Sequence, residues 1–223
     1  MTPALVLFDL DGTLVDTAPD IARALGVALE GSGVPELSLD NVKRMVGDGA
    51  RELIRRALAD VQSDGAREEA AFGRFLASYR ENVCVASQLY PGVRDGLAAL
   101  RADGAALAVV TNKPGDLSRA LLGTLGIATL FAAIIGDGDG FPRKPDPAAA
   151  QSILAKVGVP PDRAVMLGDG LPDLRLARAL GVTGIAATWG YVPAATLARE
   201  APAFLAGSFP EAISIIRGKV ARP

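Results

Sequence analysis

The sequence contains no histidine among its 223 residues. This absence excludes the Ser-His-Asp and Cys-His catalytic arrangements and nearly all zinc sites. Cysteine is almost absent as well, since Cys84 is the only one and no disulfide can form within the chain. Such cysteine usage is typical of a reducing compartment, and we expect a cytoplasmic protein. An enzyme with this composition must use carboxylates, hydroxyls, lysine and a hard metal ion.

The sequence also lacks long hydrophobic runs and an excess of one charge. No apolar stretch approaches the roughly 20 residues that span a bilayer, and the N-terminal residues do not have the pattern of a signal peptide. The 23 basic and 25 acidic residues give a net charge of −2, and the basic residues form no long run. We therefore predict neither a membrane nor a nucleic-acid partner. The oligomeric state is left open between a monomer and a homodimer.

Short, unbroken apolar runs alternate with helical patterns over most of the chain. Such runs are typical of parallel strands that are covered on both faces. The helical segments between them have the lengths of βαβ crossovers. We therefore predict an α/β fold with a doubly wound parallel sheet, that is, a Rossmann-like core. The predicted strands are residues 5–10, 106–111, 132–136, 164–168, 184–187 and, more weakly, 203–205.

One interval interrupts this alternation. Residues 17–88 contain helical patterns only, and about 70 residues are too many for a single crossover between strands. We interpret the interval as a small helical bundle inserted after the first strand. This predicts a helical domain of residues 17–88 and a core of residues 1–16 and 89–223. The predicted helices of the insert are 21–29, 39–46, 50–61 and 68–82.

Polar side chains follow the first four predicted strands. In open α/β sheets, ligands bind beyond the carboxyl ends of the strands. Carboxylates and hydroxyls with one lysine are the groups expected of a site for a hard cation and an anionic substrate. The residues are Asp9, Asp11, Gly12 and Thr13 after the first strand, Thr111 and Asn112 after the second, Lys144 after the third, and Asp169 with Asp173 after the fourth.

These four segments resemble the four motifs of the haloacid dehalogenase-like hydrolases, and they occur in the family's order. The resemblance covers the whole predicted sheet domain, and the helical insert is similar to the family's C1 type of cap. It implies a Mg²⁺-dependent hydrolysis of a phosphate ester through an aspartyl-phosphate intermediate. The matching segments are Asp9-x-Asp11-Gly12-Thr13, Thr111-Asn112, Lys144-Pro145 and Gly168-Asp169-x₃-Asp173.

The resemblance implies catalytic roles for three of these residues. Asp9 would be the nucleophile, and Asp11 would protonate the leaving alcohol and later activate the attacking water. Lys144 would be a positive charge between the phosphate and the nucleophile. Arg143 and Lys113 are nearby basic residues that compete with Lys144 for this role.

The remaining motif residues would bind phosphate and metal. Gly12, Thr111 and Asn112 would contribute to phosphate binding. The resemblance implies that Mg²⁺ is held by the Asp9 carboxylate, the Asp11 backbone carbonyl and Asp169. Asp173 would orient waters or Lys144 without binding the metal directly. One departure from the family is Gly170, since relatives usually carry Ser or Thr there, so a hydroxyl that supports the metal waters is missing.

The insert contains one loop with features of a substrate contact. Gly47 and Gly49 free the backbone of this loop, and a helix begins at the next residue. Arg51 or Lys43 could then hold a substrate carboxylate. An ordinary turn between helices with solvated basic residues fits the same sequence. Elsewhere, Asp16 is interpreted equally well as a helix cap or a functional residue, and Trp189 and Tyr191 as packing residues.

The motifs narrow the reaction to phosphomonoester hydrolysis. The dehalogenases and the phosphonate-cleaving relatives have no aspartate at the position of Asp11. The sugar-phosphate mutases typically carry a histidine in the cap, and this sequence has none. Residues 110–114, 47–50 and 90–93 are most similar to bacterial phosphoglycolate phosphatases, which predicts a small phosphorylated metabolite, most simply 2-phosphoglycolate, as substrate. N-acetylmuramate 6-phosphate, another sugar phosphate or a nucleotide are alternatives. A catalytically silent binding or regulatory protein on the same fold is the alternative from another class.

Overall fold

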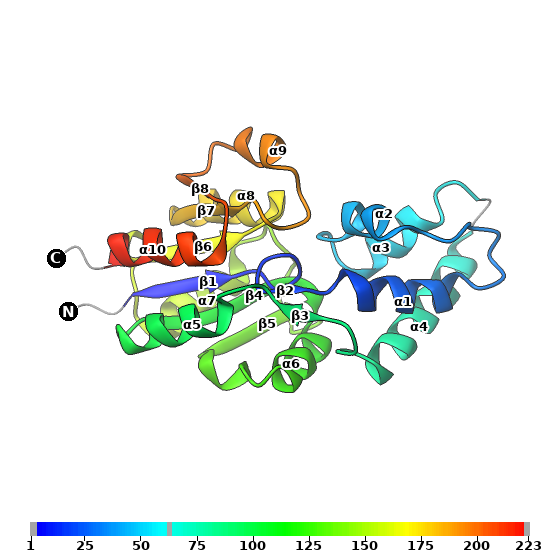
Figure 1. Ribbon diagram of the computed structural model, residues 1–223, viewed down its shortest axis with the longest axis horizontal. Coiled ribbons are helices and arrows are strands. Elements are labelled where there is room, and N and C mark those ends of the chain that lie inside the picture. The colour runs from blue at the N-terminus through cyan, green and yellow to red at the C-terminus, as the bar shows by residue number, and fades with distance from the viewer. Residues whose placement is uncertain (1–3, 62–63, 221–223) are drawn as a thin grey trace.

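A parallel six-stranded sheet forms the centre of the molecule (Figure 1). The structure, a computed structural model, describes residues 4–61 and 64–220. Residues 1–3 and 221–223 of the predicted core and 62–63 of the predicted insert therefore lie outside the described residues. In spatial order the strands are β5 (Ala133–Asp137), β4 (Ala106–Pro114), β1 (Leu5–Phe8), β6 (Ala164–Gly168), β7 (Thr183–Ala187) and β8 (Phe204–Ala206).

Helices cover both faces of this sheet because its central strand is apolar on both sides. In β1, Val6 and Phe8 join the hydrophobic cluster on one face, and Leu5 and Leu7 join the cluster on the other. Alternate residues of a strand point to opposite faces, so an unbroken apolar run requires cover on both. The predicted doubly wound, Rossmann-like sheet is confirmed. One face carries α5 (Val93–Ala102), α6 (Gly115–Thr124) and α10 (Phe209–Val220). The other face carries α7 (Ala148–Val157) and α8 (Leu171–Leu180). The connections contain three short helices, η1 (Ala128–Leu130), η2 (Pro161–Arg163) and α9 (Ala194–Ala198).

Four helices lie beyond the carboxyl ends of the strands, on the right in Figure 1. Their buried side chains, such as Ile21, Leu53 and Phe75, form a hydrophobic cluster separate from those of the sheet. Leu117 of α6 also joins this cluster, so the helices rest on the sheet region through an apolar contact. We call residues 17–88 the helical unit. Its helices are α1 (Ala18–Leu29), α2 (Leu39–Met45), α3 (Ala50–Ala57) and α4 (Gly65–Glu81).

The chain enters and leaves the helical unit through a two-stranded ladder. β2 (Val15–Asp16) pairs antiparallel with β3 (Gln88–Leu89). These two strands are not predicted from the sequence, because two residues are too few to show an apolar period. The pairing places the two connections side by side, so the helical unit is attached at one point of the sheet domain.

Asp20 fastens the second connection to the first helix. Its side chain is fully buried, and Oδ2 accepts hydrogen bonds from the backbone N–H groups of Val85, Ala86 and Ser87 over 2.8–3.0 Å. The Ser87 hydroxyl donates to the same oxygen over 2.6 Å. Burial by itself raises the pKa of a carboxyl group, but the hydrogen bonds from Ser87 and its neighbours outweigh it and lower the pKa of Asp20.

We expect Asp20→Ala to lower the free energy of unfolding by about 3 kcal/mol at pH 7, because four donors lose a charged acceptor and the two of Ser87 are buried. Since the pKa of Asp20 is lower in the folded state, its contribution is present above the ordinary value of 3.8 and is lost as the pH falls further. Urea denaturation at pH 7 and pH 3 measures both effects. Asp60→Ala, which removes an exposed carboxylate in the same unit, is the matched control. Equal losses of unfolding free energy in the two variants would contradict the stabilising role of the Asp20 hydrogen bonds.

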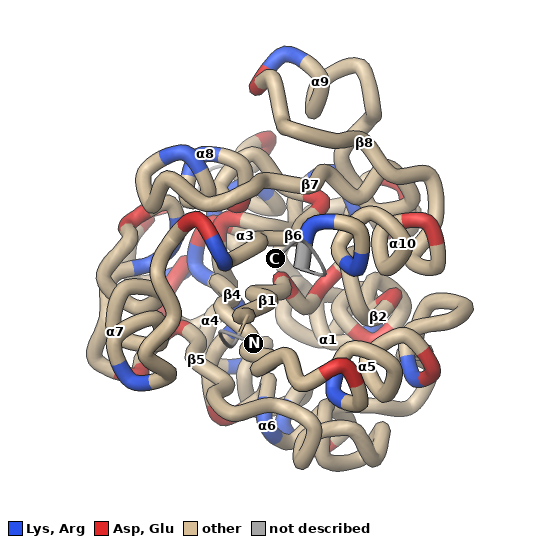
Figure 2. Tube along the Cα trace, turned by 90° about the vertical axis from the view of Figure 1, so that its left-hand side faces the viewer, with Lys and Arg blue, Asp and Glu red and all other residues tan. Residues whose placement is uncertain are grey.

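Charged residues of both signs are interspersed along the chain. Figure 2 views the molecule from the end that carries the two termini, and it shows basic and acidic positions mixed along the trace. Within residues 4–61 and 64–220, no helix is both long enough and apolar enough to cross a membrane.

Candidate active site

Three carboxylates converge at the carboxyl ends of the central strands. Asp9 follows β1, Asp169 follows β6, and Asp173 lies in the first turn of α8. One oxygen from each lies within 4.8 Å of the other two, and all three residues are buried. Like charges this close repel one another unless a cation or a proton compensates them. The cluster is thus an all-oxygen donor set that suits a hard divalent cation.

Lys144 is the ammonium group that contacts this cluster. Its Nζ lies 2.7 Å from Asp9 Oδ1 and 2.6 Å from Asp173 Oδ1, and its side chain is 2% exposed. Burial by itself lowers the pKa of an ammonium, but the charges of Asp173 and Asp9 outweigh it and raise the pKa of Lys144. Lys144 therefore carries a positive charge beside the Asp9 carboxylate.

Asp169 is fixed by donors from two neighbouring loops. Thr13 Oγ1 donates to its Oδ1 over 2.7 Å, and the backbone N–H of Tyr191 donates to its Oδ2 over 2.8 Å. Gly12 has a φ of 80°, and a Cβ added there would lie 2.3 Å from Asp169 Oδ2. Both the conformation and the close approach therefore require glycine. Burial and the charge of Asp9 raise the pKa of Asp169 to about 8.

We expect the metal-free protein to lose stability as the pH rises from about 4 to about 8. Asp169 holds its proton in the folded state up to a pKa of about 8, against an ordinary value of 3.8. The folded state therefore binds more protons than the unfolded state across this range, and its stability falls with rising pH. Mg²⁺ should remove this dependence, because it binds the ionised carboxylate.

Denaturation between pH 5 and pH 8, with chelator or with Mg²⁺, measures this dependence. Asp169→Asn has no proton to release at this position and should show a weaker pH dependence than wild type; the pKa of Asp173, which burial and the charge of Asp9 raise to about 7, contributes in the same range. Asp137→Asn is the matched control, because Asp137 ends β5 at the same edge of the sheet but lies outside the cluster. Identical pH profiles for wild type and Asp169→Asn would contradict the assignment.

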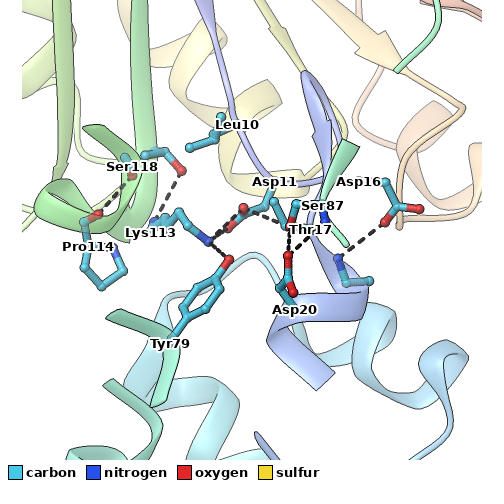
Figure 3. A network of polar contacts seen from close by, with 12 residues as sticks. Leu10, Asp11, Asp16, Thr17, Asp20, Tyr79, Ser87, Lys113, Pro114 and Ser118 are labelled. Carbon is cyan, nitrogen blue, oxygen red and sulfur yellow. Dashed lines mark hydrogen bonds and ion pairs between the residues drawn. The ribbon is translucent and has the colours of Figure 1, made fainter. Parts of the chain in front are cut away.

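The side chain of Asp11 occupies a second position, next to the helical unit. Its Oδ1 accepts from Lys113 Nζ over 3.0 Å and from Thr17 Oγ1 over 2.8 Å. Lys113 also donates to the hydroxyl of Tyr79 in α4 over 2.6 Å (Figure 3). The two buried lysines thus have different partners: Lys144 contacts Asp9, and Lys113 contacts Asp11.

A cavity of about 40 Å³ lies between the sheet edge and the helical unit. Asp9 and Asp11 line it from the sheet side, so both carboxylates face the same cavity. Apolar side chains of the helical unit make up most of the opposite wall. The lining residues are Asp9, Asp11, Ile21, Val46, Gly47, Gly49, Ala50, Leu53, Phe75, Tyr79, Thr111, Asn112, Lys113 and Pro114.

The two polar residues predicted after the second strand line this cavity in different ways. Thr111 is buried, and its hydroxyl accepts from the backbone N–H of Lys113 over 3.3 Å. The Asn112 amide donates to the carbonyls of Gly47 and Lys144 over 3.0 and 3.3 Å, and it accepts from the Lys144 N–H over 2.8 Å. Asn112 therefore connects the Lys144 segment with the helical unit, and its predicted phosphate-binding role stays a prediction.

Two basic residues of the helical unit lie away from the cavity. Arg51 pairs with Glu69 and lies over the ring of Phe72, with a side chain that is 56% exposed. Lys43 pairs with Asp16 over 3.5 Å. Neither side chain lines the cavity, so the structure does not bring Arg51 together with the other predicted site residues.

Arg143 connects the sheet domain to the helical unit instead of reaching the carboxylates. Its Nη1 donates to the backbone carbonyl of Asp48 over 2.9 Å, in the loop between α2 and α3. A Cβ at Gly49 would lie 2.6 Å from the same Nη1. The loop with Gly47 and Gly49 therefore does approach the sheet edge, and Gly49 allows a close contact.

Tyr191 has a polar role in the structure, although the sequence suggests packing alone. Its hydroxyl accepts from the backbone N–H groups of Thr17 and Ala18 over 2.8 and 3.0 Å and donates to Asp16 over 3.0 Å. Ala18 N–H also donates to Asp16 over 3.3 Å, so Asp16 does assist the start of α1. Nothing in the sequence marks Tyr191, because its partners come from a distant segment.

Gly170, which has no hydroxyl, contacts the carboxylate cluster through its backbone. The Gly170 backbone N–H donates to Asp173 Oδ2 over 2.9 Å, and a Cβ there would lie 3.2 Å from that oxygen. Thr13 supplies the hydroxyl that contacts Asp169 instead. Its position inside the first motif is the sequence signal that points to this role.

Comparison with known proteins identifies the family. The model of the haloacid dehalogenase-like hydrolases matches residues 6–187. The chain belongs to the haloacid dehalogenase-like hydrolases. The resemblance inferred from the motifs is confirmed, and so is the fold class.

Several proteins are similar to this haloacid dehalogenase-like hydrolase over most of its length. Phosphoglycolate phosphatase 1 of Pseudomonas aeruginosa is 40% identical over 205 residues, which cover 90% of this chain and 75% of that protein. A phosphoglycolate phosphatase of Chromobacterium violaceum is 39% identical over 87% of this chain and 89% of its own. The crystal structure of a predicted phosphoglycolate phosphatase from Haemophilus somnus superimposes with a TM-score of 0.89 at 32% identity, covering 96% of this chain and 98% of that one.

Proposed function

We propose that this haloacid dehalogenase-like hydrolase is a Mg²⁺-dependent phosphomonoesterase whose substrate is a small phosphorylated metabolite, most simply 2-phosphoglycolate. The observation that carries the proposal is that Asp9 and Asp11 line one cavity while Lys144 Nζ lies 2.7 Å from Asp9. The names of the relatives at about 40% identity support the same substrate.

In the proposed reaction the two aspartates act in sequence. A carboxylate oxygen of Asp9 forms a bond to phosphorus while the bond to the ester oxygen breaks, and the leaving oxygen receives a proton from Asp11. Asp11 then accepts a proton from water as that water attacks the aspartyl-phosphate. Inorganic phosphate leaves, and Asp9 returns to its free carboxylate.

The remaining groups compensate charge. Lys144 lies beside the attacking carboxylate, where it also offsets the phosphate. Asp9, Asp169 and the Asp11 backbone carbonyl would hold Mg²⁺, which supplies a further positive charge when bound. Asp173 holds Lys144 in place from behind. The three buried carboxylates and their all-oxygen character fit this hard metal.

We propose that the helical unit acts as a cap domain over the cavity. It is attached through the β2–β3 ladder and covers the sheet edge with apolar side chains of α1, α3 and α4. Such a cover excludes water from the reacting groups and strengthens the electrostatic contacts beneath it. Residues 1–16 and 89–223 would then form the catalytic core domain.

The cavity favours the small substrate over the larger alternatives. About 40 Å³ corresponds to a few water-sized sites of about 10–15 Å³ each. N-acetylmuramate 6-phosphate or a nucleotide would require a larger displacement of the helical unit from the sheet edge than 2-phosphoglycolate does. A silent binding protein has no need for an acid and a nucleophile on one cavity, so this arrangement also favours an enzyme.

A kinetic screen tests the proposed function. The panel contains 2-phosphoglycolate, N-acetylmuramate 6-phosphate, hexose phosphates and nucleoside monophosphates, with Mg²⁺ present. We expect the highest kcat/KM for 2-phosphoglycolate, because the cavity admits the smallest leaving group. A higher value for any of the larger esters would overturn the substrate assignment, and no turnover of any ester would overturn the enzymatic function.

A further inference from the structure

Lys113 lies at the contact between the sheet domain and the helical unit. It comes near the end of β4, and its ammonium lies between the Asp11 carboxylate and the Tyr79 hydroxyl of α4 (Figure 3). The distances from Nζ are 3.0 and 3.2 Å to the two Asp11 oxygens and 2.6 Å to Tyr79. The side chain is 2% exposed, so this charge is almost fully removed from solvent.

Lys113 supplies the positive charge on the leaving-group side of the cavity. Among the described residues that line the cavity, it is the only basic one. Lys144 contacts Asp9 and Asp173 on the phosphoryl side, and the Arg51 side chain is exposed. A ligand anion beside Asp11 therefore meets Lys113 as its nearest cation.

Tyr79 adds a second donor at the same place. Its hydroxyl oxygen accepts from Lys113, and no side chain in the described part of the chain accepts the proton of this hydroxyl. Burial raises the pKa of Tyr79 to about 12, so the hydroxyl stays protonated. Lys113 and Tyr79 thus present an ammonium and an O–H donor together, a pair that suits a carboxylate.

The surroundings strengthen this pair. The wall contributed by the helical unit contains the apolar side chains of Ile21, Val46, Leu53 and Phe75. In such surroundings a charge-assisted hydrogen bond is stronger than at an exposed site, so a ligand carboxylate here gains more than a neutral group of the same shape.

The chemistry of the reaction places a carboxylate at this pair. Asp11 is the proposed donor to the leaving oxygen, and Lys113 touches the Asp11 carboxylate. In 2-phosphoglycolate a single carbon separates the leaving oxygen from the carboxylate, so a leaving oxygen beside Asp11 brings the carboxylate to Lys113 and Tyr79. We propose that Lys113, assisted by Tyr79, is the specificity-determining residue that selects a leaving group with a carboxylate. The inference rests on the proposed function.

The test compares two nearly isosteric substrates, 2-phosphoglycolate and 2-phosphoglycolamide, in which an amide replaces the carboxylate. The measured quantity is the ratio of their kcat/KM values in one preparation, which does not depend on the fraction of active protein. We expect Lys113→Met to lower this ratio by about 10- to 100-fold, Tyr79→Phe to lower it less, and Lys113→Arg to restore part of it.

Lys156→Met is the matched control, because Lys156 is an exposed lysine on α7, and it should leave the ratio unchanged. A ratio that is unchanged in both Lys113→Met and Tyr79→Phe would overturn the inference while the substrate assignment stands, since wild type would still prefer 2-phosphoglycolate. A ratio that falls in Arg51→Ala and not in Lys113→Met would assign selection to Arg51. Wild-type activity on other phosphate esters without turnover of 2-phosphoglycolate would overturn the proposed substrate itself.

Discussion

Asp9→Asn should reduce kcat for a phosphate ester by roughly 10⁴-fold or more, because removal of a covalent nucleophile abolishes the principal route of the reaction. The substitution keeps the shape of the side chain. Its amide oxygen can still accept the 2.7 Å hydrogen bond from the Leu10 N–H, and Lys144 retains its contact with Asp173. The loss should therefore come from chemistry and not from unfolding.

Two measurements distinguish this cause from others. Circular dichroism and thermal unfolding should show a folded variant, and mass spectrometry after an acid quench should detect a phosphoryl adduct on Asp9 of the wild type only. Asp103→Asn is the matched control: it makes the same chemical change at an exposed ion pair with Arg217 and should leave kcat unchanged. Turnover by Asp9→Asn close to that of wild type would show that another residue is the nucleophile.

Chelation of divalent metal should lower the rate of hydrolysis by about three orders of magnitude, because a metal ion contributes several kcal/mol of charge stabilisation in the transition state. Asp9, Asp169 and Asp173 form the acidic cluster, and Lys144 is the only ammonium that contacts it among the described residues. When all three carboxylates are ionised, two negative charges stay uncompensated before the phosphate arrives. An anionic substrate can then approach only with further positive charge.

The measurement is hydrolysis of an aryl phosphate in chelator, followed by titration with Mg²⁺ and, at equal ionic strength, with Na⁺. Mg²⁺ should restore the rate and Na⁺ should not. Asp169→Asn should shift the Mg²⁺ titration to higher concentration, whereas Asp137→Asn, at the end of β5 and outside the cluster, should not. Full activity in chelator would contradict the metal site.

The two proposed roles of lysine explain why the chain carries two buried ammonium groups near one cavity. Lys144 accompanies Asp9, and Lys113 accompanies Asp11. Each is buried, and each has its pKa raised by neighbouring negative charge against the opposing effect of burial. In this proposal one charge serves the phosphoryl group in every substrate, and the other serves a leaving group that is itself anionic.

The sequence by itself determined the sheet and the positions of the motif residues. The strands begin as short apolar runs, and the motifs lie at or beyond their carboxyl ends, with Thr111 and Asn112 in the last part of β4 and Lys144 in the loop after β5. Parallel topology therefore places the motifs at one edge. For that reason the order of runs and motifs along the chain is enough to predict that Asp9 and Asp169 lie close together. The helices of the helical unit were equally predictable, because they have an apolar period and no strand pattern interrupts them.

Only the tertiary structure decided which partners these residues meet. Tyr79 and Lys113 are 34 residues apart in the chain, and they meet because the helical unit lies against the carboxyl end of the sheet. Tyr191 reaches the start of α1 from a loop 174 residues away. The sequence allows Arg51 to bind substrate, but in the structure it forms an ion pair with Glu69. Local patterns determine helices and strands because neighbouring residues form them, whereas these contacts depend on how separate elements pack.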